Sequence, residues 1–285
     1  MTKALIAFVT CNKLAELTPD DQLAVRALDA LGVQAVPEIW NDSKVEWGKY
    51  DALILRSTWD YYLHYDEFMQ WLETIETLAL PLFNEPSLVR PNSNKRYLRS
   101  LSKLGIACIE TEWLENPTAS SIQTALENQN WSAAVLKPAV SAGAFQTTVI
   151  HSNQLEAIKN LTGTWLLQPM LDEIQRDGEW SLIYIDGHFS HCVLKKPKQN
   201  DFRVQEEYGG IASAAFSPST SRQSAEKILA SFASTPLYAR IDGVMRKQEF
   251  QLMEVELIEP SLFFHLAPQA ADTFARAILK RLLPR

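Results

Sequence analysis

The sequence predicts an α/β protein that opens with a small parallel α/β lobe and continues into one or two further lobes of mixed helix and strand. Its 285 residues suffice for two or three lobes with their own cores. Near the amino terminus the order of elements is strand, helix, strand and strand, which is typical of a parallel sheet. Farther along, two alternating segments flank Asp186-Gly187, which indicates a hairpin.

The first lobe is predicted from short apolar runs and helix-start signals. Ala4–Val9 is an apolar run that fits a buried strand. The segment from Thr18 to Asp21 combines an N-cap residue, a proline and two acids, so a helix should start there, and Gly32 should end it. The other elements expected in this lobe are the strands Val33–Ile39 and Ala52–Leu55 and the amphipathic helix Asp66–Leu78. The loop-rich stretch Pro81–Pro91 is the first expected domain boundary.

A candidate substrate site follows the strand Ala52–Leu55. Ligands of parallel α/β lobes lie beyond the carboxyl ends of the strands. Arg56, Trp59 and Asp60 occupy that position. An arginine and an aspartate that flank an indole are suited to a zwitterionic, amino-acid-like substrate. An ordinary capped loop is the alternative.

Two lysines stand out in the middle of the chain. A helix is expected to open at Ser93 and to end near Gly105, which puts Lys95 in its first turn, where backbone amides favour anions. Lys137 lies in the apolar strand Trp131–Pro138. A buried ammonium without a partner is unfavourable, so Lys137 should have an anionic or carbonyl partner. The alternative is that Lys137 reaches solvent from an edge strand.

The small residues of Ser141–Phe145 would let backbone amides approach a phosphate directly after Lys137. Neither a P-loop nor a dinucleotide-binding fingerprint is present. Positive charge gathers again at Lys195, Lys196, Lys198 and Arg203. This segment would clamp phosphate if it lay near acidic strands, and a solvated basic loop is the alternative. The remaining expected elements are the strand Trp165–Met170, the hairpin strands Glu179–Ile185 and His188–Lys196, and the helices Ser217–Phe232 and Ala267–Leu283.

Three carboxylates belong to the last two strands. Glu254 and Glu256 should point the same way along one strand, while Val255 and Leu257 face the core. Asp242, near the end of the preceding strand, reaches the same face if the strands pair. Such hard oxygen ligands suit Mg²⁺ or Mn²⁺, which also bridge nucleotide phosphates. A solvated acidic strand face is the alternative.

The composition limits the classes of partner that the protein can bind. The formal net charge of −7 argues against general binding of nucleic acid or of an anionic membrane surface. Cys11, Cys108 and Cys192 are far apart, which fits reduced thiols in the cytoplasm. No stretch approaches the roughly 20 apolar residues of a membrane span. A homo-oligomer is compatible with the sequence but is not indicated by it.

Together these segments resemble the ATP-grasp superfamily, with Pro91–Arg285 as the ATP-grasp part and Met1–Val89 as an amino-terminal substrate lobe. The segments that carry the resemblance are a lysine on a helix, a lysine on a strand before a small-residue loop, a Gln-Pro strand, and Asp242 followed by Glu254-Val-Glu256 and Pro260. The runs Arg-Ser-Thr-Trp-Asp-Tyr, Gly-Glu-Trp-Ser and Glu-Leu-Ile-Glu-Pro are most similar to glutathione-synthetase-like members, among them the O-ureido-serine cyclo-ligases of cycloserine biosynthesis.

The resemblance implies a role for each matching position. The groups expected on the ATP phosphates are Lys95 and Lys137, covered by a mobile loop with Ser141, Ala142 and Gly143. The expected adenine and ribose contacts are Gln168, Pro169, Met170 and Glu179. The expected catalytic cations on the transferred phosphoryl and acyl groups are Arg203 and Arg240, together with Lys137. The expected Mg²⁺ ligands are Asp242, Glu254 and Glu256, and Ser261 matches a substrate-loop position. Two departures are a loop with a single glycine and Glu256 in place of a common asparagine.

The implied architecture has three parts: a substrate lobe at residues 1–92, a central lobe at 93–168 and a metal-bearing lobe at 169–285. The implied function is an ATP- and Mg²⁺-dependent ligase. It would convert a small amino-acid-like carboxylate into an acyl phosphate for attack by an amine from a second substrate or from the same molecule. The alternatives are a kinase-like phosphotransferase on this fold and a nucleotide-binding regulator without turnover.

Overall fold

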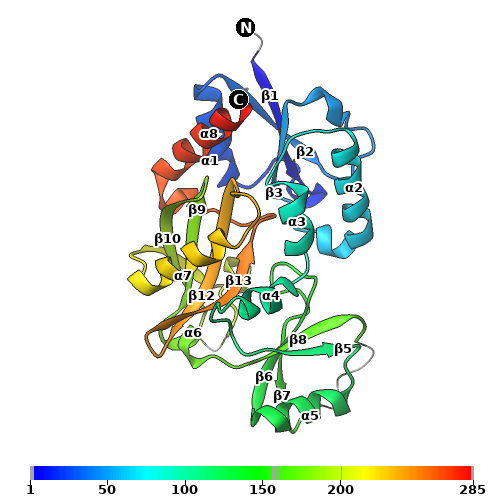
Figure 1. Ribbon diagram of the computed structural model, residues 1–285, viewed down its shortest axis with the longest axis vertical. Coiled ribbons are helices and arrows are strands. Elements are labelled where there is room, and N and C mark those ends of the chain that lie inside the picture. Colours follow the sequence, from blue (N-terminus) through cyan, green and yellow to red (C-terminus); the bar gives the residue numbers. More distant parts are fainter. Residues whose placement is uncertain (1–2, 156–157, 159–160, 200, 284–285) are drawn as a thin grey trace.

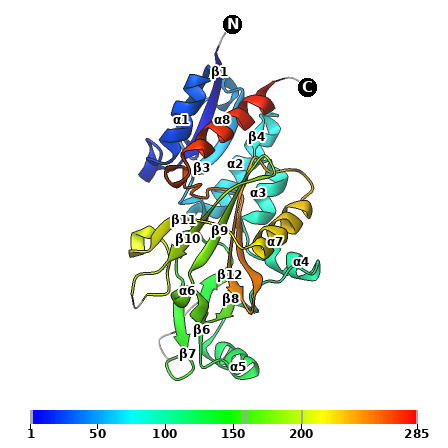
Figure 2. The same ribbon diagram turned by 90° about the vertical axis from the view of Figure 1, so that its left-hand side faces the viewer.

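Three sheets follow one another along the long axis of the molecule in the computed structural model, which describes residues 3–155, 158, 161–199 and 201–283 (Figures 1 and 2). Sheet A belongs to the first part of the chain, sheet B to the last part, and sheet C lies at the other end of the molecule. The α/β fold class is therefore confirmed, with a parallel sheet A and antiparallel sheets B and C.

Sheet A has the strand order β2-β1-β3-β4 and is parallel throughout. Its strands are β1 (Ala4–Thr10), β2 (Val33–Ile39), β3 (Ala52–Ser57) and β4 (Leu82–Phe83). One face packs against α1 (Asp21–Ala30) and α8 (Pro268–Leu282), and the other packs against α2 (Tyr65–Thr77). Because α8 comes from the far end of the chain, the two ends of the sequence share one hydrophobic core.

The stretch predicted as loop between Pro81 and Pro91 contains a helix, α3 (Pro86–Asn92). Pro86 lies in the first turn of α3. Backbone N–H groups in the first turn of a helix have no partner within it, so the N–H that proline lacks removes no hydrogen bond. Pro91 lies in the last turn, and the helix buries Leu88 and Val89. Burial of these apolar side chains therefore outweighs the prolines that favoured a loop.

The next helix, α4 (Tyr97–Lys103), begins two residues after Lys95, so the prediction that Lys95 lies in its first turn is wrong. Lys95 instead lies in a tight turn, and its backbone N–H donates to the Ala139 carbonyl oxygen at 2.8 Å.

Sheet C is antiparallel, with the order β5-β8-β6-β7. Its strands are β5 (Glu112–Glu115), β6 (Ala133–Pro138), β7 (Thr148–His151) and β8 (Thr164–Pro169), and α5 (Ala119–Gln129) covers one face. Strand β6, which carries Lys137, lies between β7 and β8. The alternative that placed Lys137 on an edge strand is therefore wrong.

Sheet B is antiparallel, with the order β11-β10-β9-β12-β13. Its strands are β9 (Glu179–Ile185), β10 (His188–Lys196), β11 (Ile211–Ala215), β12 (Tyr238–Arg246) and β13 (Glu249–Glu256). The helix α7 (Ser219–Ala230) covers one face together with apolar residues of α4, and the short helix α6 (Asp172–Arg176) precedes β9. The hairpin at Asp186-Gly187 is confirmed.

Two β-bulges set the register of sheet B. One interrupts the pairing of β9 and β10 between Phe189 and His191, and the other interrupts the pairing of β12 and β13 between Asp242 and Gly243. A bulge adds one residue to one strand, and every side chain beyond it on that strand moves to the other face. The second bulge places Glu254 directly opposite Asp242.

Gly243, directly after Asp242, leaves no room for a side chain. A Cβ there would lie 2.4 Å from both the Gln251 carbonyl oxygen and the buried Phe250 ring. We expect Gly243→Ala to lower the free energy of unfolding in urea by about 1–3 kcal/mol, because the fixed backbone and the packed ring must both shift. Gly48→Ala is the matched control, since its Cβ would meet nothing within 4 Å, and it should leave stability nearly unchanged. Equal effects at the two sites would contradict this packing argument.

Within the described ranges, no helix combines the length and the apolar character needed to cross a bilayer. The division at residues 92 and 168 stays a prediction. Sheet A uses residues 4–83, sheet C 112–169 and sheet B 179–256.

Candidate active site

One face of sheet B carries the charged groups of the candidate site. The pairing places Asp242 between Ser181 and Glu254, Arg240 opposite Glu256, and Glu179 opposite Lys195. Residues directly opposite each other in an antiparallel pair share a face. The other face is apolar and packs under α7. The shared face predicted for the three carboxylates is therefore present.

Asp242 lies at the centre of this face and is only 2% exposed. Its carboxylate accepts hydrogen bonds from Ser181 Oγ at 2.6 Å, Lys195 Nζ at 3.3 Å and Arg240 Nη2 at 2.9 Å. Burial would raise the pKa of Asp242, but Arg240 and Lys195 outweigh it and hold the pKa at about 2. Asp242 is therefore ionised at neutral pH and balanced by two buried cations.

Glu254 connects sheet B to the middle of the chain through Lys95. Lys95 Nζ lies 3.0 Å from Glu254 Oε1 and also donates to the Ser141 carbonyl oxygen at 2.6 Å. Lys137 is half-buried, and within the described part of the chain its ammonium has neither a hydrogen bond nor an ion pair. Burial and nearby Lys95 lower the pKa of Lys137, and Glu254 opposes them. Two lysines from different segments therefore lie close to one carboxylate.

Glu256 accepts a hydrogen bond from Arg240 Nη2, and Arg240 Nη1 donates to the Ser261 carbonyl oxygen at 3.2 Å. Burial, assisted by Asp242 and Glu254, raises the pKa of Glu256 to about 7, although Arg240 opposes the shift. Arg240 thus offsets the extra negative charge of a glutamate at this position.

Lys195 is a member of this face that the sequence grouped only with a basic loop. Its ammonium lies 2.6 Å from Glu179 and 3.3 Å from Asp242. Burial alone would lower the pKa of Lys195, but Asp242 and Glu179 raise it. The expected ribose contact, Glu179, is therefore already ion-paired, with Lys195.

The three proposed metal ligands fit Mg²⁺ as a partial set. Among residues 3–283, leaving out the few that are not described, no three or more Asp, Glu, His or Cys side chains converge closely enough to form a complete metal cage. Mg²⁺ commonly uses one or two carboxylates together with phosphate oxygens and water. Asp242 and Glu254 on neighbouring strands offer such a pair.

The substrate residues predicted in the first lobe differ in their exposure. Arg56 is 2% exposed, and its guanidinium donates to Asp21 at 2.8 Å and to the Pro260 carbonyl oxygen at 3.0 Å. Asp60 accepts from the indole of Trp40. Trp59 is 44% exposed, while its Nε1 donates to the Glu259 carbonyl oxygen. These contacts favour a structural role for Arg56 and leave the Trp59 ring open to a ligand.

The small-residue loop lies between the first lobe and sheet B. The Phe145 ring packs against Tyr62 with centroids 4.9 Å apart. A Cβ on Gly143 would lie 3.3 Å from a carboxylate oxygen of Glu207. Ser141 and Ala142 pack inward, Ser141 against Lys95 and Ala142 against the core of the first lobe. The loop is therefore in place to cover a ligand bound near Lys95.

The remaining predicted positions are placed as follows. Gln168, at the end of β8, is buried and donates to Thr111 Oγ1 at 2.9 Å, while Met170 is partly exposed just after Pro169. Arg203 pairs with Asp201 at 2.8 Å, and its guanidinium stacks 3.8 Å from the centroid of the Tyr208 ring. Arg203 is thus held within its own loop.

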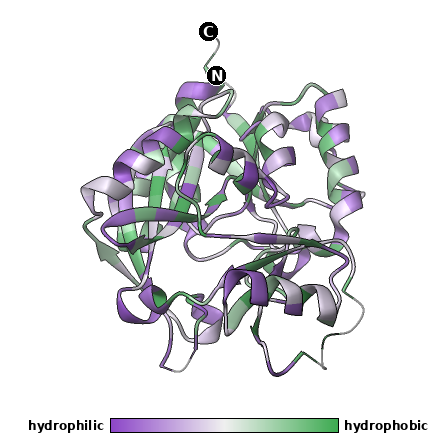
Figure 3. Ribbon diagram, turned by 60° about the horizontal axis from the view of Figure 1, so that its bottom comes forward, coloured by the Kyte–Doolittle hydropathy of each residue, from purple (hydrophilic) through white to green (hydrophobic). Residues whose placement is uncertain are grey.

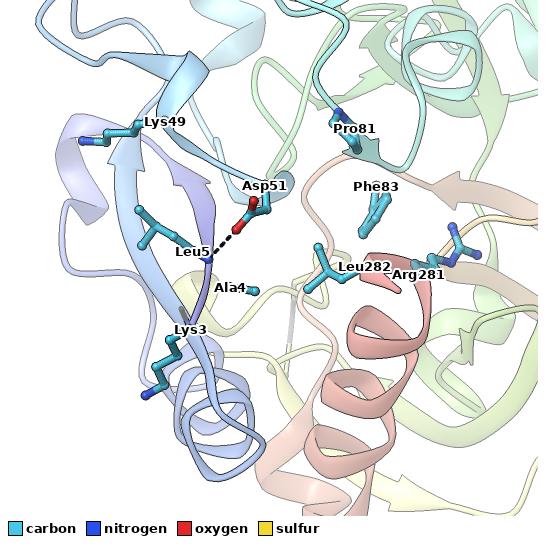
Figure 4. A pocket seen from close by; sticks show the side chains of 9 residues that line it. All are labelled: Lys3, Ala4, Leu5, Lys49, Asp51, Pro81, Phe83, Arg281 and Leu282. Atoms are coloured by element: carbon cyan, nitrogen blue, oxygen red, sulfur yellow. Dashed lines mark hydrogen bonds between the residues drawn. The ribbon is translucent and has the colours of Figure 1, made fainter. Parts of the chain in front are cut away.

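A hollow lies at the amino ends of β1 and β3 (Figure 4). Trp59 follows the carboxyl end of β3, so it belongs to the opposite end of sheet A. Its lining includes Lys3, Lys49, Asp51 and Arg281. The three cations are already ion-paired, with Asp29, Glu38 and Asp186 respectively. Charge in this hollow is therefore balanced, and it lacks the group of cations found around Glu254.

Comparison with known proteins agrees with this geometry. Residues 6–84 match the family model described as the N-terminal domain of D-cycloserine synthetase DcsG. The chain is 25% identical over 305 aligned residues to the cycloserine biosynthesis protein DcsG of Streptomyces lavendulae, covering 98% of this chain and 99% of that protein.

Solved structures give the same result for the fold. The crystal structure of D-cycloserine synthetase DcsG superposes with a TM-score of 0.87 at 24% identity, covering 98% of this chain and all of that one. D-alanine–D-alanine ligase from Bacillus anthracis gives a TM-score of 0.69 at 15% identity, with 98% and 97% covered. A RimK domain ATP-grasp protein from Sphaerobacter thermophilus gives 0.70 at 15% identity, with 97% and 100% covered.

The resemblance to the ATP-grasp superfamily that the lysine and carboxylate segments indicated is thus confirmed. It extends over nearly the whole chain, including the first lobe. The protein has the ATP-grasp fold and is similar to D-cycloserine synthetase along its length.

Proposed function

We propose that the protein is an ATP- and Mg²⁺-dependent ligase that activates a small amino-acid-like carboxylate as an acyl phosphate for attack by an amine. The proposal rests on one observation: the segment with Lys95 and the strand with Asp242 both reach Glu254. Lys95 lies 3.0 Å from this carboxylate, Lys137 is nearby, and Asp242 faces Glu254 across the strand pair. Such a group can bind a triphosphate and a divalent cation at the same place.

Each residue has a defined task in this proposal. Asp242 and Glu254 would hold Mg²⁺, which neutralises phosphate charge when bound, and Glu256 stays the predicted third ligand. Lys95 and Lys137 bind phosphate oxygens, and Lys137 has no competing partner in the described chain. Arg240 stabilises the charge of the transferred phosphoryl or acyl group, and Arg203 approaches from its loop. Gln168, Pro169 and Met170 contact the adenine, with Glu179 near the ribose.

The small-residue loop gives the chemistry a dry environment. Ser141, Ala142 and Gly143 would lie over the phosphates, and the contact of Phe145 with Tyr62 would keep the loop against the first lobe. Exclusion of water protects an acyl phosphate from hydrolysis. The protein is expected to work in the cytoplasm, where its three free thiols stay reduced.

The relatives favour an amino-acid-like substrate. One is named for cycloserine synthesis and another for joining D-alanine to D-alanine. The similarity to D-cycloserine synthetase is compatible with an amine that comes from the activated molecule itself, so that a ring closes. Trp59 and Ser261 are the residues proposed to contact this substrate.

Glu254→Gln tests the proposal directly. We expect phosphate release, measured with ATP, Mg²⁺ and a panel of amino-acid carboxylates, to fall by about 10²–10³-fold, because the variant loses a metal ligand and the partner of Lys95. Glu249→Gln, an exposed change on the same strand, should keep full activity. A stable phosphorylated product without free phosphate would instead indicate the kinase-like alternative. An absence of turnover with bound ATP would indicate the regulator.

A further inference from the structure

Side-chain hydrogen bonds hold the backbone of residues 258–261, which follow β13. Four consecutive carbonyl oxygens each accept a hydrogen bond from a side chain: Ile258 from Tyr238 at 2.8 Å, Glu259 from Trp59 at 2.9 Å, Pro260 from Arg56 at 3.0 Å, and Ser261 from Arg240 at 3.2 Å. The donors come from the first lobe and from β12. The backbone that carries Glu259 and Ser261 is therefore fixed from two sides.

The side chains on this fixed backbone are left free. Glu259 is 8% exposed, yet in the described residues its carboxylate has neither a hydrogen bond nor an ion pair. The half-buried hydroxyl of Ser261 has no hydrogen-bond partner there either. Buried carboxylates are normally paired, since the charge loses its hydration on burial. Burial, together with Glu256 and Glu254, accordingly raises the pKa of Glu259 well above its usual range.

The cations near Glu259 are already bonded to other groups. Arg240 bonds to Asp242 and Glu256, and Lys95 bonds to Glu254 and Ser141. Bound ATP would compete for these cations, and Mg²⁺ would compete for the carboxylates that pair with them. Lys95 and Arg240 act on Glu259 from a distance and oppose the rise of its pKa, but burial and the carboxylates Glu256 and Glu254 outweigh them, so a further cation would be stabilised there.

An aromatic surface adjoins Glu259. The indole Nε1 of Trp59 donates to the Glu259 backbone carbonyl oxygen, and Trp59 is 44% exposed. Tyr61, two residues farther, is buried, and its pKa is raised first by burial and then by Glu259. An ammonium group that meets both a carboxylate and an indole face is bound by charge and by cation–π attraction.

We propose that Glu259 binds the ammonium group of the substrate, with the Trp59 ring beside it, and so selects amino-acid-like carboxylates over carboxylates without an amine. This inference rests on the proposed function, because it assigns a specificity residue to the same site. It gives Glu259 a role that neither nucleotide nor metal requires.

The test measures binding in the presence of ADP and Mg²⁺ by titration calorimetry, with the full chain. D-serine and D-alanine serve as amine probes, and D-glycerate and D-lactate are the matched 2-hydroxy acids. The wild type should bind D-serine at least about tenfold more tightly than D-glycerate. In Glu259→Gln the amine probes should lose about tenfold to a hundredfold in affinity, while the hydroxy acids keep theirs. Glu259→Asp, which keeps the charge, should recover part of the preference.

Two controls separate this inference from the proposed function. The affinity for ADP with Mg²⁺ is measured first in every protein, and it tests nucleotide binding independently of Glu259. Glu249→Gln should bind all probes as the wild type does. The inference fails if the wild type shows no preference for amines, if Glu259→Gln retains that preference, or if hydroxy acids lose affinity equally. Should Glu259→Gln not fold, Glu259→Asp decides the question: an amine preference smaller than that of the wild type supports the inference, and an unchanged preference contradicts it.

Discussion

Replacing Lys137 with alanine is expected to lower ATP turnover by about 10²–10³-fold while the fold is retained. Lys137 lies on an interior strand of sheet C, and within the described chain its ammonium has no partner. A half-buried cation without a partner is suited to the oxygens of a transferred phosphoryl group, whose charge spreads in the transition state. Because the ammonium makes no hydrogen bond or ion pair with the described residues, its removal should cost little stability.

Phosphate release and urea unfolding, measured on the same preparation, check this expectation. Lys227→Ala, an exposed change on α7, is the matched control and should alter neither quantity. Lys137→Arg keeps the charge but changes its geometry, so it should recover only part of the rate. Unchanged turnover in Lys137→Ala would remove Lys137 from the proposed chemistry.

Asp242→Asn is expected to lower the free energy of unfolding by about 3–5 kcal/mol, because it takes the negative partner away from two buried cations. Arg240 and Lys195 both bond to this carboxylate, and both are buried. Ser181→Ala removes only one of the hydrogen bonds to Asp242 and should cost about 1 kcal/mol. The two variants together separate charge pairing from hydrogen bonding.

The same carboxylate predicts a pH dependence of stability. Its pKa in the folded protein is about 2, below the ordinary value of 3.8, so it contributes stability that is present above pH 4 and is lost as the pH falls through 2. Integrated over this window, the contribution is about 2 kcal/mol. The difference in unfolding free energy between the wild type and Asp242→Asn should therefore narrow by about 2 kcal/mol in acid. Curves that stay parallel from pH 7 to pH 2 would contradict the assigned pairing.

The residues of the charged face could be named from the sequence, but their register could not. Counting back from the turn after Arg246 would place Asp242 opposite Met253, and only the bulge moves Glu254 into that position. Counting from Asp186-Gly187 would likewise pair Glu179 with Leu194, and the bulge near Ser190 turns Lys195 toward the carboxylates instead. A bulge depends on packing across strands that are distant in sequence, so a local pattern does not reveal it.

Long-range contacts explain the other differences. Arg56 has the position and charge of a substrate residue, but its partners are Asp21 and the carbonyl of Pro260, which only the folded chain brings to it. In the sequence, Glu259 stands within the run Glu-Leu-Ile-Glu-Pro that carries the family resemblance, and nothing there indicates that its side chain is buried. Its burial depends on the first lobe packing against the end of β13, which the sequence does not reveal. The periodic helices and strands, by contrast, were predictable because their apolar faces are local properties.

The packing of α8 against sheet A has a consequence for how the protein forms on the ribosome. Phe274 and Ile278 belong to the same core as Phe8 and Leu28. The first lobe therefore cannot cover its apolar face until the chain beyond sheets B and C has been synthesised. During translation that face should attract chaperones or the growing chain itself, and completion of the first lobe should be among the last steps of folding.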